Sequence, residues 1–363
     1  MKTMWMVIFL GLPLLGMAYI AWHVWTLVPL AAGWRGALIG AMVASFLLLF
    51  CNLGRAIDSM PMWLARLVYD VGNSAIFVML YLVIIFLVLD LGRLLHLVPP
   101  RLIHHNFYTT AAIAIGLFAV FLYGNLHYHD KVRQELTLTT DKPLARPLKL
   151  VLLSDLHLGY HNPRTELARW VDMINAEQPD LVLIAGDVID MSMRPLLEEN
   201  MAEELQRIKA PIYACLGNHE YYSGEPDAQR FFYDAKINLL QDASTVVGDL
   251  CIIGRDDRTN MRRASMEDLA AKADMKRFTI LLDHQPYHLE KAEQAGIDFQ
   301  FSGHTHHGQV WPVSWITEAI YECAFGEHQR GNTRYYVSSG IGIWGGKFRI
   351  GTRSEYVVAT LKN

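Results

Sequence analysis

The chain contains little cysteine and has no strong excess of charge of either sign. Its four cysteines, Cys51, Cys215, Cys251 and Cys323, are widely separated in 363 residues. This spacing supports neither a disulfide framework nor a cysteine-based zinc site. The formal net charge is -4 at pH 7, and the C-terminal half has no continuous basic stretch. No nucleic-acid partner is therefore expected.

Charge is also absent from the middle of four long apolar stretches in the N-terminal third. They cover residues 4–24, 36–54, 74–92 and 107–127, each 19 to 21 residues long. A helix of this length can cross a hydrocarbon core of about 30 Å. Aromatic residues lie near the ends of the stretches, as in interfacial belts. We therefore predict a transmembrane region of four helices over residues 1–128, with the lipid bilayer as its partner.

The first stretch has an alternative interpretation as a cleaved signal peptide, because Lys2 precedes its apolar core. Its length and the three stretches that follow argue against cleavage. Four spans would place both termini on one side of a cell membrane, and the positive-inside rule then favours a cytoplasmic catalytic domain. The basic residues near the membrane are Lys2, Arg55, Arg66, Lys131, Arg133 and Lys142 on that side and Arg35, Arg93 and Arg101 on the other.

The remainder of the chain reads as a linker and one α/β domain. Residues 129–147 are polar and include Pro143 and Pro147, which predicts a linker. From residue 148 onward, apolar strand-like runs alternate with helical patterns. This order predicts a mostly parallel core sheet, with a second sheet packed against it. The predicted strands are 148–153, 181–184, 211–216, 245–253, 278–282, 298–302, 334–339 and 354–361, and the predicted helices are 163–176, 195–208, 226–235, 264–273 and 287–295.

Six short polar motifs follow the apolar runs of this domain. Side chains at strand ends can converge at one edge of a sheet. Carboxylates, an amide and several imidazoles then form a ligand set for two divalent transition metals, of which Mn, Fe, Zn or Co suit imidazole best. The motifs are Asp155-Leu156-His157, Gly186-Asp187-Val188-Ile189-Asp190, Gly217-Asn218-His219-Glu220, Asp283-His284, Gly303-His304 and Thr305-His306.

Spacing and residue type suggest a role for each candidate ligand. Asp155 and His157 are two residues apart after a strand-like run, which predicts that both face the same ion. The same argument applies to His304 and His306. Asp187 has two carboxylate oxygens and can bridge two cations.

Three further residues complete the predicted site. Asn218 offers a neutral amide oxygen, and His284 follows another apolar run. His219 is adjacent to Asn218 and points elsewhere, which makes it a candidate acid or transition-state stabiliser. Three other histidines of this domain, His161, His288 and His328, are expected at the surface.

Over residues 148–363, this series of motifs resembles the calcineurin-like metallophosphoesterase superfamily. The segment Gly303-His304-Thr305-His306-His307-Gly308-Gln309 is most similar to a bacterial phosphodiesterase branch that includes membrane-anchored proteins. The resemblance implies a four-layer αββα sandwich with metals at the C-terminal strand ends. It also implies that a hydroxide held between the two metals attacks the phosphorus.

The resemblance carries over to individual residues. It implies that Asp190 orients His219, which stabilises or protonates the leaving oxygen. The metal ligands that it implies are Asp155, His157, Asp187 and His306 for one ion, and Asp187, Asn218, His284 and His304 for the other.

Two positions depart from the family pattern. His307 stands where this branch commonly has glycine, and it would narrow the pocket. Ser338-Ser339-Gly340 lacks the arginine that often precedes this glycine in relatives. Lys347 and Arg349 are the candidates to replace that phosphate contact.

These observations predict a membrane-anchored, metal-dependent phosphoric ester hydrolase, either a phosphodiesterase or a phosphatase. A membrane anchor favours a lipid-linked substrate, such as a phospholipid, a prenyl phosphate or a nucleotide-activated lipid precursor. One alternative resembles the pyrophosphatase that acts on UDP-diacylglucosamine, although those enzymes lack four spans. An alternative of another class is a non-catalytic membrane receptor or scaffold. The intact ligand set and His219 argue against it.

Overall fold

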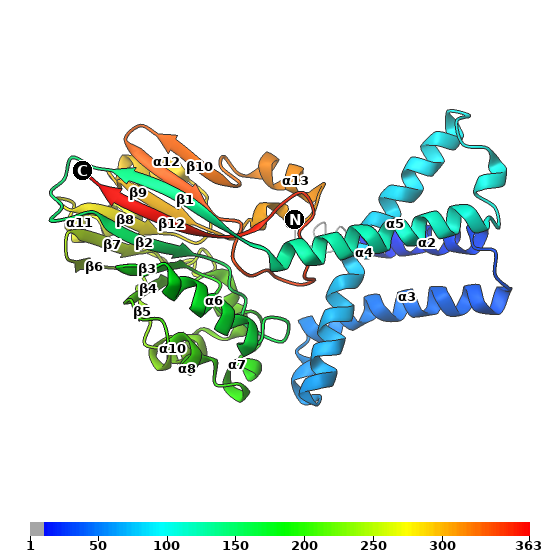
Figure 1. Cartoon of the computed structure of the whole chain (residues 1–363), viewed down its shortest axis with the longest axis horizontal. Helices are drawn as coiled ribbons and strands as arrows, with labels where there is room; N and C mark the ends of the chain where they lie inside the picture. Colours follow the sequence, from blue (N-terminus) through cyan, green and yellow to red (C-terminus); the bar gives the residue numbers. More distant parts are fainter. Residues whose placement is uncertain (1–10) are drawn as a thin grey trace. The chain divides into compact units, whose positions relative to one another are not determined.

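The computed structural model describes residues 11–363. The chain divides into two compact units, Met1–Gly124 and Asn125–Asn363, which are described separately (Figure 1). The first unit is helical, and the second contains all twelve strands of the described residues.

Four α-helices lie wholly or mostly in the first unit, and three of them are long and apolar enough to cross a membrane. The remaining helix, α2, has 16 described residues, and the span predicted at 4–24 begins outside the described residues. The count of four spans therefore stays a prediction. The helices are α2 (Leu12–Leu27), α3 (Ala32–Leu53), α4 (Met62–Leu94) and α5 (Phe107–His129), with short 3-10 turns at η2 (Ala56–Ser59) and η3 (Pro100–Leu102).

Helix α4 is longer than the third apolar stretch predicted over 74–92. It begins at Met62 and includes Arg66 and Asp70 in its first turns. A helix of 33 residues is about 50 Å long, which exceeds the roughly 30 Å of hydrocarbon. Its first turns can therefore carry charge outside an apolar layer.

A polar contact connects α2 to α4 inside the first unit. The Tyr19 hydroxyl donates a hydrogen bond of 2.6 Å to Asp90 Oδ2. His23 Nε2 lies 3.1 Å from the same oxygen, and its ring stacks on Phe86 at 4.4 Å between centroids. These contacts pack α2 against α4 within the first unit.

The second unit contains two mixed six-stranded sheets, which confirms the predicted α/β sandwich. The first sheet has the order β1-β12-β2-β3-β4-β5 and the second β10-β11-β9-β8-β7-β6. The strands of the first sheet are β1 (Lys131–Thr139), β2 (Leu148–Leu153), β3 (Leu181–Ala185), β4 (Ile212–Cys215), β5 (Asn238–Leu239) and β12 (Ser354–Lys362). Those of the second are β6 (Ala243–Val247), β7 (Leu250–Gly254), β8 (Phe278–Leu282), β9 (Phe299–Ser302), β10 (Gly326–Arg330) and β11 (Thr333–Val337).

Three apolar clusters hold these elements together. One joins the two sheets, and it includes Leu152 of β2 and Ile280 of β8. A second packs helices against the first sheet, and a third packs α11 and α12 against the second sheet. The helices are α6 (Arg164–Ala176), α7 (Arg194–Glu198), α8 (Met201–Leu205), α9 (Asn218–Ser223), α10 (Glu225–Asp234), α11 (Met266–Lys272), α12 (Leu289–Gln294) and α13 (Val313–Ile320), with a 3-10 turn η4 (His306–Gly308).

The linker predicted over 129–147 is wrong for residues 131–139, which form strand β1. β1 pairs in parallel with β12 over nine residues, from Lys131 opposite Ser354 to Thr139 opposite Lys362. It is an edge strand with exposed polar residues on one side and buried Leu136 and Leu138 on the other. Because half of its residues face solvent, its composition resembles that of a loop.

Candidate metal centre

The predicted ligands lie on loops immediately after strands, and several have an unusual backbone. Asp155, His157, Asp187, His304 and His306 all have φ between 44° and 71°. Left-handed conformations are rare for residues other than glycine and mark loops under local strain. We predicted that alternation along a strand would bring these side chains to one ion, and this is wrong. They converge through left-handed turns beyond the strand ends.

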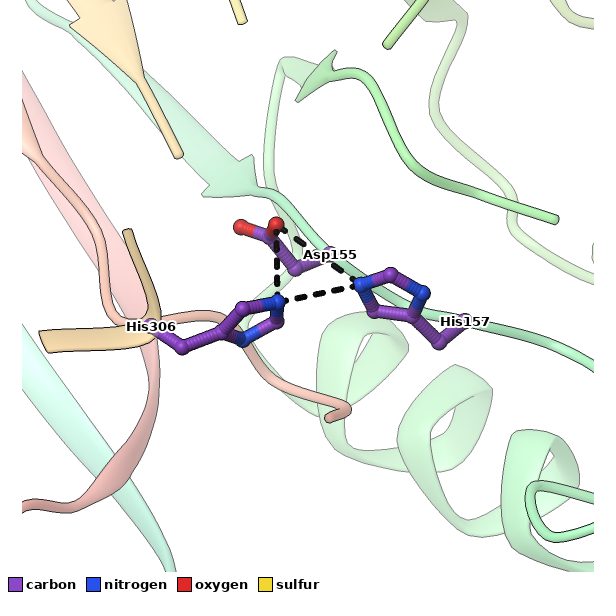
Figure 2. A group of neighbouring side chains, drawn as sticks. All are labelled: Asp155, His157 and His306. Carbon is purple, nitrogen blue, oxygen red and sulfur yellow. Dashed lines mark hydrogen bonds and ion pairs between the residues drawn. The ribbon is translucent and has the colours of Figure 1, made fainter. Parts of the chain in front are cut away.

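One group of ligand atoms joins the loops after β2 and β9 (Figure 2). His306 Nε2 lies 3.5 Å from Asp155 Oδ1 and 3.1 Å from His157 Nε2. His157 Nε2 is in turn 3.8 Å from Asp155 Oδ1. Asp155 also accepts the backbone N–H of His304 at 3.0 Å. The structure thus brings the first and last motifs of the chain to one point.

A second group consists of Asp187, His284 and His304, whose ligand atoms lie within 4.8 Å of one another. His284 Nε2 is 3.1 Å from Asp187 Oδ2. Asp187 Oδ2 is also 3.6 Å from His157 Nε2, so this carboxylate lies between the two groups. That position suits the bridging role expected for it.

The donors fit divalent cations in their hydrogen bonding as well as their chemistry. The buried Asn218 Oδ1 has no hydrogen-bond partner in the structure. His284 Nδ1 lies 2.7 Å from the carbonyl oxygen of Ala185, to which it must donate. In a neutral ring, the Nε2 lone pair then faces the Asp187 carboxylate, and a cation between these two acceptors removes the conflict.

Burial and charge set the protonation of these groups. Burial lowers the pKa of His304 to about 4 and that of His306 to about 3, so both rings are neutral at pH 7. Burial also lowers the pKa of His157, but Asp155 and Asp190 outweigh it and raise that pKa to about 10. A proton on His157 supplies positive charge that a cation would replace, because metal binding releases protons from its ligands.

Asp190 lies beside the two groups and contacts two imidazoles. Its Oδ1 is 3.2 Å from His157 Nδ1 and 3.4 Å from His219 Nδ1. His219 also approaches the Asp190 carbonyl oxygen at 3.2 Å, and its backbone N–H donates to Asp187 Oδ1 at 2.9 Å. The ring therefore has its Nδ1 side toward Asp190. A ligand atom of His219 also falls within 4.8 Å of those of His157 and Asp187.

Glu220 plays a larger structural part than its sequence position suggested. Its carboxylate is fully buried and accepts the backbone N–H groups of Gly217 at 2.7 Å, Ile189 at 2.9 Å and Asp187 at 3.1 Å. Burial, and then the nearby Asp187 charge, raise the pKa of this carboxyl. Glu220 thus fixes the Asp187 loop to the start of α9. The only sequence signal was its place three residues after Gly217.

Glycines give the ligands room at two points. A Cβ on Gly217 would lie 2.2 Å from Asp187 Oδ1, and one on Gly303 would lie 2.3 Å from Asp155 Oδ2. Both distances are far below any real carbon–oxygen contact. Glycine is therefore required in the Gly-Asn-His and Gly-His motifs, because the backbone packs closely against a carboxylate at both positions.

Lys347 and Arg349, the candidates for a phosphate contact, both bind other groups of the protein. Arg349 is fully buried, and its guanidinium donates to the carbonyl oxygens of His306, Ser339 and Gly342. Lys347 Nζ donates to Glu166 Oε2 at 2.7 Å. The expectation of a phosphate contact from either residue is therefore wrong.

Two histidines outside the ligand set also differ in placement. His307 Nε2 lies 3.0 Å from Glu318 Oε1, and its ring stacks on Phe325 at 4.6 Å between centroids. These contacts hold it on neighbours outside the two ligand groups. His161 was expected at the surface, but it is buried with Nε2 2.5 Å from the Ile343 carbonyl oxygen.

Comparison with known proteins identifies the family. A family model described as calcineurin-like phosphoesterase matches residues 148–308. An uncharacterized metallophosphoesterase of Campylobacter jejuni is 30% identical over 260 residues, which cover 69% of this chain and 69% of that protein. The chain belongs to the calcineurin-like metallophosphoesterase family. This metallophosphoesterase is therefore a metal-dependent phosphoric ester hydrolase, and its family uses a centre of two divalent metals.

Two other relatives add information on architecture. A Danio rerio protein named transmembrane protein with metallophosphoesterase domain is 28% identical over 331 residues, covering 84% of this chain and 75% of that protein. An uncharacterized metallophosphoesterase of Aquifex aeolicus is 29% identical over 253 residues, covering 66% of this chain and 95% of that protein. The transmembrane relative and the three long apolar helices indicate that this metallophosphoesterase is associated with a membrane.

Proposed function

We propose that this metallophosphoesterase is a multi-pass membrane protein that hydrolyses a phosphate ester with two bound divalent metals. The observation that carries the proposal is the pair of buried ligand groups that adjoin at Asp187. Imidazole-rich sites favour Mn, Fe, Zn or Co. We also propose that the protein has four membrane spans and that its catalytic domain is a four-layer αββα sandwich.

The ligand assignment follows the two groups. We assign one ion to Asp155, His157, Asp187 and His306, and the other to Asp187, Asn218, His284 and His304. When bound, two such ions supply Lewis-acid charge that activates water and neutralises the phosphate oxygens.

The protein's own acid–base group is His219. Its Nδ1 side faces Asp190, which leaves Nε2 to hold or donate a proton at the leaving oxygen. Asp190 acts through His219, and also through His157, by holding the ring orientations. Asp190 is thus a positioning residue in this proposal.

Arg258 is our candidate for the anion contact that Arg349 and Lys347 cannot make. Within the described residues it has no carboxylate partner, and its guanidinium lies 4.0 Å from the centre of the Tyr287 ring. Tyr287 is 4.7 Å from Tyr321, whose ring is 6.3 Å from His304. A guanidinium stacked on a ring keeps its N–H edge free to bind phosphate oxygens.

We further propose that the catalytic domain is cytoplasmic and that the substrate is linked to a lipid. The basic residues near the apolar helices support the orientation. Membrane association supports a lipid-linked ester such as a phospholipid or a prenyl phosphate. The relatives described above give no support to the UDP-diacylglucosamine alternative, and family membership argues against a non-catalytic receptor.

The test is hydrolysis of bis(p-nitrophenyl) phosphate by the full chain in detergent with Mn²⁺. We expect metal-dependent turnover that falls at least about a hundredfold in His304→Ala. His328→Ala is the matched control, because His328 is a partly exposed imidazole on β10 that contacts Glu322. Equal turnover in all three proteins, or none in the metal-loaded wild type, would contradict the proposal. A panel of phospholipids and UDP-diacylglucosamine then separates the substrate classes.

A further inference from the structure

A short helix next to the metal centre exposes an apolar face. Four large apolar residues of helix α13 and of the two residues before it are exposed to solvent. The exposed fractions are 40% for Trp311, 61% for Trp315, 58% for Ile316 and 57% for Ile320. Within the helix, Ile316 and Ile320 are four residues apart and Trp315 is adjacent to Ile316, so the three form one broad side. Trp311, just before the helix, is four residues from Trp315. Trp311 and Trp315 also contact each other edge to face, at 5.3 Å between ring centroids. We call these four residues the α13 apolar face.

The α13 helix rests on the loop that carries His304 and His306. A Cβ on Gly308 would lie 2.3 Å from the backbone nitrogen of Ser314, so the two segments are in close contact. Ser314 is the buried position of the helix. The apolar face therefore lies on a helix packed against the ligand loop.

The same helix is also tied to the end of α5. The Trp311 backbone N–H donates to the Ile350 carbonyl oxygen at 2.7 Å. In the same loop, the Lys347 carbonyl oxygen accepts a hydrogen bond of 3.1 Å from Asn125 Nδ2 of α5. The end of α5 is itself embedded, because Tyr128 is fully buried and donates to Asn162 Oδ1 at 2.7 Å. All of these residues belong to the second unit.

Helix α5 is one of the three helices able to cross a membrane, and only Asp130 separates it from β1. The last residues of α5, from Asn125 onward, are therefore part of the second unit. An exposed face with two tryptophans and two isoleucines, near the point where a membrane helix ends, has the composition of an interfacial anchor.

We propose that the α13 apolar face inserts into the interface of the bilayer that the chain's own helices span. This inference rests on the membrane anchoring in the proposed function. Trp311 and Trp315 would lie at the headgroup level, with Ile316 and Ile320 toward the acyl chains. The insertion brings the ligand loop to the membrane surface, so the site takes phosphate esters carried by lipids.

The test measures lipid contact at α13 in the full chain. A nitroxide is attached at Ile316→Cys in a Cys51→Ala background, in nanodiscs of phosphatidylethanolamine and phosphatidylglycerol. Collision rates with oxygen, which partitions into lipid, are compared with those of a water-soluble nickel chelate. The parent without an added cysteine reports labelling of the buried Cys215, Cys251 and Cys323.

Two matched positions make the outcome decisive. Ile115→Cys is on α5 and 67% exposed, and it reports the membrane anchor itself. Tyr233→Cys is on α10 and 82% exposed, and it reports a surface in water. We expect Ile316→Cys to favour oxygen collisions, as Ile115→Cys does, and Tyr233→Cys to favour the chelate.

Two results would overturn the inference alone: chelate collisions at Ile316→Cys equal to those at Tyr233→Cys, or spin–spin broadening that marks a second copy of the chain on this face. Chelate access at Ile115→Cys would instead remove the membrane anchoring on which the inference rests. Hydrolysis of the soluble aryl diester tests the chemistry independently of either result.

Discussion

Asp190 contacts two imidazoles through one carboxylate oxygen, at 3.2 Å from His157 and 3.4 Å from His219. In Asp190→Asn the negative charge is lost, and one oxygen can no longer hold both rings in the same tautomer. We expect kcat for the aryl diester to fall by about 10² or more while metal content changes little. Steady-state kinetics and metal analysis of the same sample check this. Asp172→Asn, an exposed carboxylate on α6, is the control.

The buried His161 should make the stability of the fold sensitive to acid. Burial lowers its pKa from 6.5 to about 4. Between these two values the unfolded chain binds a proton that the folded chain does not, so the free energy of unfolding decreases as the pH falls. The full effect is about 3 kcal/mol. We expect the unfolding temperature of His161→Gln to change less between pH 7 and 5 than that of wild type. An identical pH slope in the two proteins would contradict this, and His328→Gln serves as control.

The residue types of the metal centre were predictable, but the way they converge was not. Six of the seven expected ligands lie in the groups of ligand atoms, and they could be named because carboxylates and imidazoles follow strand-like runs. The left-handed turns at Asp155, His157 and His306 were not visible, because only packing against distant loops stabilises such a backbone. The hydrogen bonds from Arg349 to carbonyl oxygens likewise depend on contacts that no local sequence pattern reveals.

At the scale of elements, Glu220 joins two loops that come from β3 and β4. Its carboxylate accepts three backbone N–H groups. In Glu220→Gln, the side-chain NH₂ faces at least one of these donors, so we expect a loss of about 2–4 kcal/mol in stability and weaker metal retention. Chemical unfolding followed by Trp fluorescence checks the first, and metal analysis after dialysis the second. Glu203→Gln is the matched control at an exposed carboxylate, and equal stability in both variants would sink the idea.

Helices and strands with a clear hydrophobic periodicity or a continuous apolar run were predicted correctly. Those that mix apolar and polar residues were not. β3 and β8 are buried along their whole length and read directly as strands. β1 is half exposed and was assigned to a linker, since its pairing with β12 lies more than two hundred residues away. The region 195–208 was predicted as one helix but forms α7 and α8, which are separated by Asn200 at φ 52°.

At the scale of the whole molecule, metal removal should affect stability and activity together. Without metal, three carboxylates and several buried imidazoles share one small volume, and ligand binding to the native state alone stabilises it by mass action. We expect dialysis against EDTA to abolish hydrolysis and to lower the unfolding temperature of the second unit by several degrees. Re-addition of Mn²⁺ should restore both. An unchanged unfolding temperature with full loss of activity would place the metals outside the buried groups.

The single residue between α5 and β1 sets the geometry in which this protein meets its substrate. One residue spans at most about 3.6 Å, so with α5 in a bilayer the catalytic unit cannot leave the surface. For the lipid-linked substrate that we propose, encounter then occurs by lateral diffusion in two dimensions. The rate should follow the mole fraction of substrate among the lipids, and dilution of the vesicles at constant composition should leave it unchanged. A soluble relative working from bulk solution would show the opposite dependence.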